Sequence, residues 1–429
     1  MSISRRQFLK GAGLGLAGTA AATVMPTSSA SASRIATGIT RVRERASGPV
    51  TLTMWINNPT EKQQDYALID AFMSSHPTIK VNMVEKSATG YNTAITAALA
   101  ANAAPDIVGV TPGQQYVAVA KAGRLLDVTK RVNVSALNDA ARQVIYVGNK
   151  VYGIPFIGEY TTGIFYWKAE FHKYKITPPN TWSEMVNICK KLLNNGLTPI
   201  QQPSQDGEIP TFFWTGAMTT VRGPGGVTAV AEGKAKVTDA DFMSATQFLK
   251  DLVPYYAKGY VSTSYDAGQA VFAEGGAVML EAGSADYTAF VNENPKAKGG
   301  LGFFAFPHPD TTGFSSVNSG VDLLFGINAN IKDSAKISAG VTLMQWFMTA
   351  KASNQVARTL DQPETKTARV TDPFFREILA QSKYNAPEWY ELPQLSALWD
   401  YSLEHIGAMM SGAMTVEAFS RGAQAKVSL

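Results

Sequence analysis

Cysteine and histidine are few in this chain and form no motif of the kind that catalyses hydrolysis or holds a metal. A single cysteine, Cys189, argues against a disulfide framework or a thiolate metal cage, and its apolar helical surroundings predict a buried thiol. No G-x-S-x-G or H-x-x-x-H pattern occurs around the four scattered histidines, His76, His172, His308 and His405. Carboxylate pairs that cleave glycosides are assembled in space, so a secreted hydrolase remains an alternative.

Aromatic and hydrogen-bonding side chains instead suit the non-covalent binding of a sugar. A sugar has apolar ring faces and polar edges, so its site needs aromatic platforms together with fixed amides and carboxylates. The candidate platforms are Trp55, Trp214, Tyr287 and Trp399, although Trp55 also fits a core position. The candidate hydrogen-bonding residues are Asn57, Asn58, Gln114, Glu159, Tyr160, Glu208, Glu281, Ser284 and Asp322.

The segment 269–284 predicts how one group of these residues is positioned. Its pattern indicates a helix that stops at Gly275 and Gly276, then a buried strand over 277–280. A polar turn follows, and Ser284 is expected to cap the next helix. This order places polar groups at the carboxyl end of a strand, where open α/β sheets bind ligands.

The start of the folded region predicts a second such edge. The alternating, β-branched run 50–56 indicates a strand, the apolar spacing over 61–75 a helix, and 79–84 another strand. This βαβ unit places Asn57 and Asn58 at the carboxyl end of its first strand. A helix over 91–102 and a strand from Pro105 lead to the loop 110–115, which carries Gln114.

Length and charge set further bounds. A chain of 429 residues, 45% of them hydrophobic, is long enough for two cores, which favours two lobes. Seven of the 38 basic residues and one of the 34 acidic residues fall within 1–49. The remainder carries 31 basic and 33 acidic groups, so the net charge of +4 comes from the leader and gives no indication of nucleic-acid binding.

The leader has the features of an export signal. Residues 4–10 read SRRQFLK, the twin-arginine pattern, and a short Gly/Ala-rich apolar run follows. The small residues at 30–32 predict cleavage before Ser33, and residues 33–49 read as a linker. No cysteine follows the apolar run, so we expect a periplasmic protein without a lipid anchor.

Several segments resemble one family. Phe272, Gly275, Ala277, Met279 and Gly283 match F-x-x-G-x-A-x-M-x-x-x-G, a signature of sugar-binding extracellular solute-binding proteins (maltose-binding-protein-like, cluster 1) of ABC importers. The aromatic residue that often follows this motif is replaced here by Ala285, with an aromatic only at Tyr287. Further segments resemble the family at 105–108, 123–129, 148–155, 178–184 and 392–399.

The resemblance implies an α/β fold of the two-lobe periplasmic-binding-protein type II, each lobe a mostly parallel sheet flanked by helices. It implies a signal peptide at 1–32, a linker at 33–49, an N-terminal lobe at 50–157 plus 319–353, and a C-terminal lobe at 158–318 plus 354–429. Hinges are expected near 155–161, 307–319 and 350–361.

The implied function is binding of a mono- or oligosaccharide, or a related polyol, between the lobes. Hinge closure would then present the solute to the permease subunits of an ABC importer, with no enzymatic activity, no cofactor and no metal. The protein is expected to be a monomer that binds no nucleic acid. A receptor for a polyamine or a glycerol phosphate remains an alternative.

Overall fold

The computed structural model describes residues 48–57, 62–86, 90–156, 159–223, 225–311, 313–357, 365–366, 368–381 and 385–428. Residues Gly48–Leu429 form one compact unit. The expected signal peptide and all but the last two residues of the expected linker lie outside the described residues, as does Asn58. Within Gly48–Leu429 the chain builds two main sheets, each with its own core.

The first sheet has the strand order β2-β1-β3-β12-β6. Its strands are β1 (Val50–Ile56), β2 (Ile79–Glu85), β3 (Ile107–Val110), β6 (Gly153–Pro155) and β12 (Leu324–Ile327). In β1 the alternating Leu52, Met54 and Ile56 are fully buried, as the period-2 pattern predicts. Strand β1 runs parallel to β2 and β3, whereas β12 runs antiparallel to β3 and β6.

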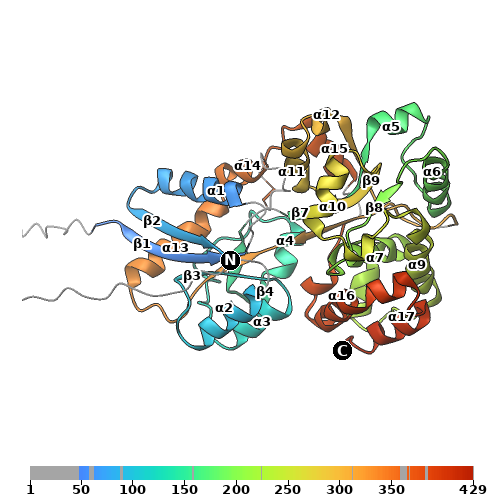
Figure 1. Cartoon of the computed structure of the whole chain (residues 1–429). Coiled ribbons are helices and arrows are strands. Elements are labelled where there is room, and N and C mark those ends of the chain that lie inside the picture. The colour runs from blue at the N-terminus through green and yellow to red at the C-terminus, as the bar shows by residue number, and fades with distance from the viewer. Residues whose placement is uncertain are drawn as a thin grey trace, which may run out of the picture. The chain divides into compact units, whose positions relative to one another are not determined.

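Helices cover this first sheet and complete the first lobe (Figure 1). They are α1 (Lys62–Ser75), α2 (Tyr91–Ala100), α3 (Gln114–Lys121), α4 (Asp139–Val144), α13 (Ser334–Phe347) and α14 (Ala350–Val356). A two-stranded ribbon, β4 (Tyr146–Val147) with β5 (Lys150–Val151), lies near α3. Ala352 and Val356 of α14 pack into the first-lobe core.

The second sheet is built around the long strand β7 (Glu159–Trp167), in the order β13-β11-β7-β9-β8. The other strands are β8 (Ile200–Gln201), β9 (Met279–Gly283), β10 (Leu301–Phe304), β11 (Val317–Val321) and β13 (Asn385–Ala386). Strands β9, β10 and β11 all pair antiparallel with β7.

The two-lobe α/β architecture with mostly parallel sheets is therefore confirmed. Among the described strands, β12 alone runs against the others in the first sheet, and β7 alone does so in the second. The reversal of β7 follows from the crossovers. Strand β7 enters the second lobe from β6, and β11 returns beside it to β12, so the two crossing segments run in opposite directions and pair antiparallel.

The second sheet is covered on both faces (Figure 1). Ile164 and Tyr166 of β7 face the larger core, and Phe165 faces the smaller one. The larger core involves α6 (Trp182–Asn194), α7 (Glu208–Arg222), α8 (Gly225–Ala231), α9 (Ala240–Asp251), α16 (Ser396–Ser411) and α17 (Val416–Gln424), and the smaller one α10 (Tyr265–Ala273), α11 (Asp286–Glu293), α12 (Ala297–Gly300) and α15 (Pro373–Gln381).

Short elements complete the lobe. Helix α5 (Lys168–Lys173) follows β7 directly, and 3₁₀ turns within the described ranges connect other elements. These turns are η2 (Val253–Tyr255), η3 (Tyr260–Ser262), η5 (Trp389–Glu391) and η6 (Pro393–Leu395).

The segment 269–284 differs in detail from its prediction. Helix α10 does end before Gly275, which has a φ of 84°. However, β9 occupies Met279–Gly283 rather than 277–280, because its register with β7 pairs Gly283 with Thr162. Ser284 is not the helix cap, since α11 begins at Asp286 and its N-cap is Ala285.

Candidate functional site

A row of polar side chains crosses one face of the second sheet. The register places Asn318 of β11 opposite Thr162 of β7, and Glu281 of β9 opposite Ile164, two residues along the same face. Strand β8 pairs Gln201 with Leu280, so Gln202, the next residue, continues the face that carries Glu281. We call Asn318, Thr162, Glu281 and Gln202 the polar row.

The polar row is buried without its full set of hydrogen bonds. Each of the four residues is at most 3% exposed. The unpartnered atoms are Asn318 Oδ1, Thr162 Oγ1, both carboxylate oxygens of Glu281, and both Oε1 and Nε2 of Gln202. Because buried polar groups in folded proteins nearly always find a partner, these unpartnered atoms make the polar row a candidate binding face.

Helix α7 covers the face that carries the polar row and adds further polar groups. Thr211, in its first turns, is fully buried and its Oγ1 has no hydrogen-bond partner. Asn318 Nδ2 donates to the carbonyl of Phe212 at 3.1 Å, which joins the row to the helix. Glu208 is the first residue of α7 and is exposed, with its backbone N–H donating to Asp206 Oδ1 at 3.2 Å.

Glycine at position 207 allows the start of α7 to lie where it does. Gly207 has a φ of 77°, and a Cβ at this position would stand 2.1 Å from the carbonyl oxygen of Leu403 in α16. An L side chain therefore cannot be accommodated on steric grounds, apart from the backbone strain of the left-handed region. The close approach of α7 to α16 fixes the position of Glu208.

Glu388 brings a further carboxylate to this region. It is fully buried at the start of η5, and burial together with the nearby Glu391 raises its pKa well above the usual range. Thr215 and Asn318 lower the pKa of Glu388 and so oppose this rise. The side-chain hydrogen bonds of these two residues go to the backbone carbonyls of Thr211 and Phe212. Glu391 in turn accepts from the backbone N–H of Val321 at 2.9 Å, so η5 is tied to β11.

The pKa values of five carboxyl groups, those of Glu208, Glu281, Asp286, Asp322 and Glu388, are raised, and burial is the first cause in each case. The pKa of Glu208 rises to about 7, with additional repulsion from Asp206, Asp322 and Asp286. The pKa of Asp322, in the connection between β11 and β12, rises to about 6. The pKa of Glu281 is raised well above its usual range by burial and by Glu388, Asp286 and Glu208.

Glu208 and Asp322 are the most exposed of these carboxyl groups. Both have exposed side chains, whereas Glu281 and Glu388 are buried.

Asp286 completes the group and is held by several donors. Tyr265 Oη donates to its Oδ2, Gln269 Nε2 donates to Oδ1 at 2.6 Å, and the backbone N–H of Gly283 donates to Oδ2 at 2.8 Å. Burial nevertheless outweighs these bonds and raises the pKa of Asp286. We call Glu208, Glu281, Asp286, Asp322 and Glu388 the carboxylate cluster.

The first lobe contributes polar groups beside the end of β1. Asn57 is half-buried, and its Oδ1 is buried without a hydrogen-bond partner. Gln114, the first residue of α3, is exposed. Trp55 is half-buried against the first-lobe core, with Lys86 Nζ 4.3 Å from the centre of its ring. Tyr91 Oη fixes this edge by donating to the carbonyls of Trp55 and Gly109.

Two of the expected aromatic platforms are wrong. Trp214 is 0% exposed, packs 5.3 Å from Trp389, and donates its Nε1–H to Thr246. Tyr287 is 7% exposed, stacks on Phe374 and accepts a hydrogen bond from the backbone N–H of Gly299. Both rings are core components, because they lie on the inward faces of α7 and α11.

Trp399 belongs to an aromatic group that the sequence did not fully reveal. It is 8% exposed and lies 5.2 Å from Phe212 and 5.1 Å from Tyr390, measured between ring centres. Phe212 and Tyr390 are half-buried, so they present the accessible aromatic surface of this group. The carbonyl of Phe212 also accepts the Asn318 bond, which places the aromatic group beside the polar row.

The remaining candidates have structural roles or lie outside the described residues. Ser284 is fully buried, and its Oγ accepts a hydrogen bond from the Thr161 N–H at 3.2 Å. Glu159 and Tyr160 lie in β7, opposite Val321 and Gly320, but their side chains are outside the described part. Several members of the polar row, the carboxylate cluster and the aromatic group were not predicted as ligand residues: Thr162, Gln202, Phe212, Asp286, Asn318, Glu388 and Tyr390. Of these, Gln202 and Phe212 lie in a polar and aromatic run after a short strand, which is a local signal.

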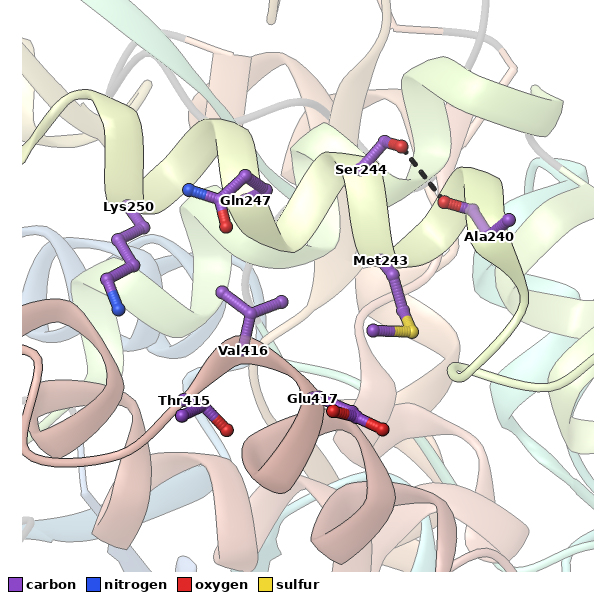
Figure 2. A pocket seen from close by; sticks show the side chains of 8 residues that line it. All are labelled: Ala240, Met243, Ser244, Gln247, Lys250, Thr415, Val416 and Glu417. Carbon is purple, nitrogen blue, oxygen red and sulfur yellow. Dashed lines mark hydrogen bonds between the residues drawn. The ribbon is translucent and has the colours of Figure 1, made fainter.

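A hollow lies on the surface between α9 and the start of α17 (Figure 2). Its lining includes Met243, Gln247, Lys250, Val416 and Glu417. It shares no residue with the polar row or the carboxylate cluster, and its walls are outward-facing side chains of two helices. It is an open surface depression and not the candidate site.

Metal and membrane roles find no support in the described residues. Within them, no three His, Cys, Asp or Glu residues are placed to hold a metal ion together. Among the helices that the structure describes, none combines the length and apolar character needed to cross a membrane.

Comparison with known proteins places the chain in a family. The family model described as bacterial extracellular solute-binding protein matches residues 67–369. An uncharacterized ABC transporter extracellular-binding protein of Pyrococcus horikoshii is 25% identical over 125 residues. That match covers 29% of this chain and 30% of the length of the curated relative.

Solved structures with the same fold cover nearly the whole described region. A chitin oligosaccharide binding protein has a TM-score of 0.77 at 21% identity, covering 88% of this chain and 98% of that one. The GacH receptor of Streptomyces glaucescens, studied with acarbose, has a TM-score of 0.74 at 19% identity, covering 88% and 97%. RafE in complex with raffinose has a TM-score of 0.71 at 19% identity, covering 87% and 100%.

Proposed function

Because the chain belongs to the bacterial extracellular solute-binding proteins, we propose that it binds a mono- or oligosaccharide between its two lobes and presents it to an ABC importer. The observation that carries this proposal is the polar row, whose buried carboxylate and amide atoms lack partners next to an accessible aromatic pair. Sugar hydroxyls donate and accept hydrogen bonds, and sugar ring faces pack on aromatic side chains.

Each lobe supplies part of the proposed site. Asn57 and Gln114 contribute amides from the first lobe, with Trp55 beside them. Glu208, Glu281 and Asp322 contribute carboxylates from the second lobe and the crossover. Phe212 and Tyr390, supported by Trp399, form the stacking surface. Asn58, Glu159 and Tyr160 stay predicted ligand residues.

Delivery depends on a change between two states. Contacts that a solute makes with both lobes at once favour a closed arrangement, since a ligand shifts an equilibrium only by its differential affinity for the two states. The permease would recognise the closed, loaded form. Hinges for this change are predicted near 155–161, 307–319 and 350–361.

The proposal includes the cellular setting and the absence of catalysis. The twin-arginine leader would export the chain to the periplasm, where it acts as a monomer without a lipid anchor or cofactor. The carboxylate cluster favours a neutral or cationic solute, so it disfavours an anion such as a glycerol phosphate as ligand. The hydrolase alternative is tested directly, since release of reducing sugar from oligosaccharides would contradict a purely binding role.

A thermal-shift screen of saccharides tests the proposed function. A ligand that binds only the native state raises the melting temperature in proportion to RT ln(1 + [L]/Kd), so a solute at 100 times its Kd adds about 2.7 kcal/mol. We expect one class of saccharide to raise the melting temperature saturably. If no saccharide does so and glycerol phosphates do, the carbohydrate assignment is wrong.

A further inference from the structure

The carboxylate cluster is an accumulation of like charge around Glu208. Electrostatic repulsion couples Glu208 to Asp206, Asp286 and Asp322, and Glu208 in turn acts on Glu281 and Glu388. No lysine, arginine or histidine is among the principal interactions of these carboxyl groups in the part of the chain that the structure describes. None of the ion pairs between described residues joins one of these carboxyl groups to a basic side chain.

The polar row supplies an independent indication that something binds there. Glu281 is 1% exposed and Gln202 is 0% exposed, yet the carboxylate oxygens of one and both amide atoms of the other have no hydrogen-bond partner. Leaving such groups unpaired is costly in the free energy of folding. The three oxygens need donors and the single amide nitrogen needs an acceptor, so the missing partner is rich in donors.

A metal ion is a poor candidate for the missing partner. No group of three or more potential metal ligands is placed to share an ion within the described ranges. Ca²⁺ and Mg²⁺ require several oxygen ligands converging at about 2.0–2.6 Å. A protonated amine has three N–H donors and one positive charge, so it can serve carboxylates that do not converge on one point.

We infer that the solute bound by this protein carries a protonated amine and that Glu208 accepts it, with Glu281, Asp286 and Glu388 supplying further negative charge. The inference rests on the proposed function, since it specifies the saccharide as one with a free amino group. A neutral sugar satisfies one or two carboxylates through its hydroxyl groups but leaves the repulsion within the cluster in place. An ammonium group offsets that repulsion and makes charge-assisted hydrogen bonds.

Two observations identify Glu208 as the recipient. It is exposed, so a solute can reach it, whereas Glu281 and Glu388 are buried. It is also the member that interacts with the greatest number of the others. The titratable groups that act on the cluster from neighbouring elements are Asp206, Asp266, Glu391, Tyr256 and Tyr265.

Matched oligosaccharides test the inference. Glucosamine oligomers and their N-acetylated counterparts share the same ring skeleton and differ in the charge at nitrogen. At about pH 7.5, where Glu208 with its pKa of about 7 is mostly ionised, we expect calorimetric titration to give at least ~10-fold tighter binding for the free amines, with affinity falling as salt is added. Glu208→Gln should abolish the preference, whereas Glu293→Gln, an exposed substitution at the end of α11, should keep it.

The outcomes separate the inference from the proposed function. Equal or tighter binding of the N-acetylated oligomers overturns the inference and leaves saccharide binding intact. Binding of a linear polyamine such as spermidine, without any saccharide, supports the amine and overturns the sugar function. Failure of all amines and all saccharides to bind overturns both. Glu281→Gln gives a second variant of the same shape, and an unchanged preference in both variants contradicts the role of the cluster.

Discussion

Glu281 shows how a single residue departs from the requirements of a core. Its partners across and along the sheet on the same face are Ile164 and Met279, which are both buried and apolar. An apolar side chain at this position would extend the core without cost. The carboxyl group instead has two unpartnered oxygens, which is a stability cost that a binding role explains.

Removing the charge at this position should stabilise the empty protein. Glu281→Gln keeps the shape of the side chain and removes an unpaired carboxyl, so we expect the free energy of unfolding at about pH 8 to rise by roughly 1–3 kcal/mol. Chemical denaturation without ligand measures this change. Glu293→Gln, which is exposed, should change the free energy of unfolding by no more than ~0.5 kcal/mol.

A fall in stability of the Glu281→Gln variant would mean that the carboxylate has partners that hold the fold together. In that case the unpartnered oxygens would not represent an open binding position.

The raised pKa values predict how stability depends on pH. A carboxyl group whose folded pKa lies above its unfolded value keeps its proton longer in the folded state, so stability is highest below the unfolded pKa and falls as pH rises. The stability contributed by Asp322 is lost between pH 3.8 and about pH 6, and that contributed by Glu208 between pH 4.5 and about pH 7. We therefore expect the melting temperature of the ligand-free protein to decrease from about pH 5 to about pH 8.

The double variant Glu208→Gln with Asp322→Asn should flatten this pH profile. A saturating amine-bearing ligand should flatten it as well, because it stabilises the charged carboxylates. A melting temperature that rises over the same range would show that these groups are ordinary solvated carboxylates.

At the scale of elements, the start of α7 depends on Gly207. Gly207→Ala adds a Cβ that would stand 2.1 Å from Leu403 O at a φ of 77°, so the helix start must shift. We expect a loss of about 2 kcal/mol or more in the free energy of unfolding, together with weaker ligand binding. Gly412, with a φ of 84° and no atom within 4 Å of the place a Cβ would take, is the matched control.

Gly412→Ala should cost about 1 kcal/mol of stability from backbone strain alone and leave ligand affinity unchanged. Equal effects of the two glycine substitutions on binding would show that the approach of α7 to α16 does not position the site.

The sequence predicted an element well where the interactions that set its ends join residues close together in the chain. The sequence indicated a capping box at α6, and Thr181 Oγ1 does accept from the Glu184 N–H at 3.3 Å while Glu184 accepts from the Thr181 N–H at 3.2 Å. The strand β9 was displaced from its prediction because pairing with β7, more than a hundred residues earlier in the chain, decides which residues are extended. Composition around 277–280 holds no information on that register.

The site was predictable only in part for the same reason. Glu208, Glu281 and Asp322 could be predicted as ligand residues because they lie in loops or at element ends with a family resemblance. Trp214 and Tyr287 were misassigned, since amphipathic spacing does not reveal which lobe face covers a helix. Glu388 and Asn318 were missed because they reach the site from strands and turns over 100 residues from Glu208, and only the assembled sheet brings them together.

At the scale of the whole molecule, export should depend on the twin-arginine pair. Replacing Arg5 and Arg6 with lysine keeps the charge and removes the recognised pattern, so we expect the precursor to accumulate inside the cell. Cell fractionation with immunoblotting measures the distribution. Arg41→Lys with Arg43→Lys, in the expected linker, should leave export intact. Normal export of the first variant would contradict the twin-arginine assignment.

The central claim is that one small solute is held by residues from both lobes, and calorimetric titration of a saccharide that raises the melting temperature tests it most directly. The account predicts one ligand per chain, with Asn57→Ala in the first lobe and Glu208→Gln in the second each weakening affinity by about 10-fold while the variants remain folded. Absence of saturable binding, or full affinity in either variant, would contradict it.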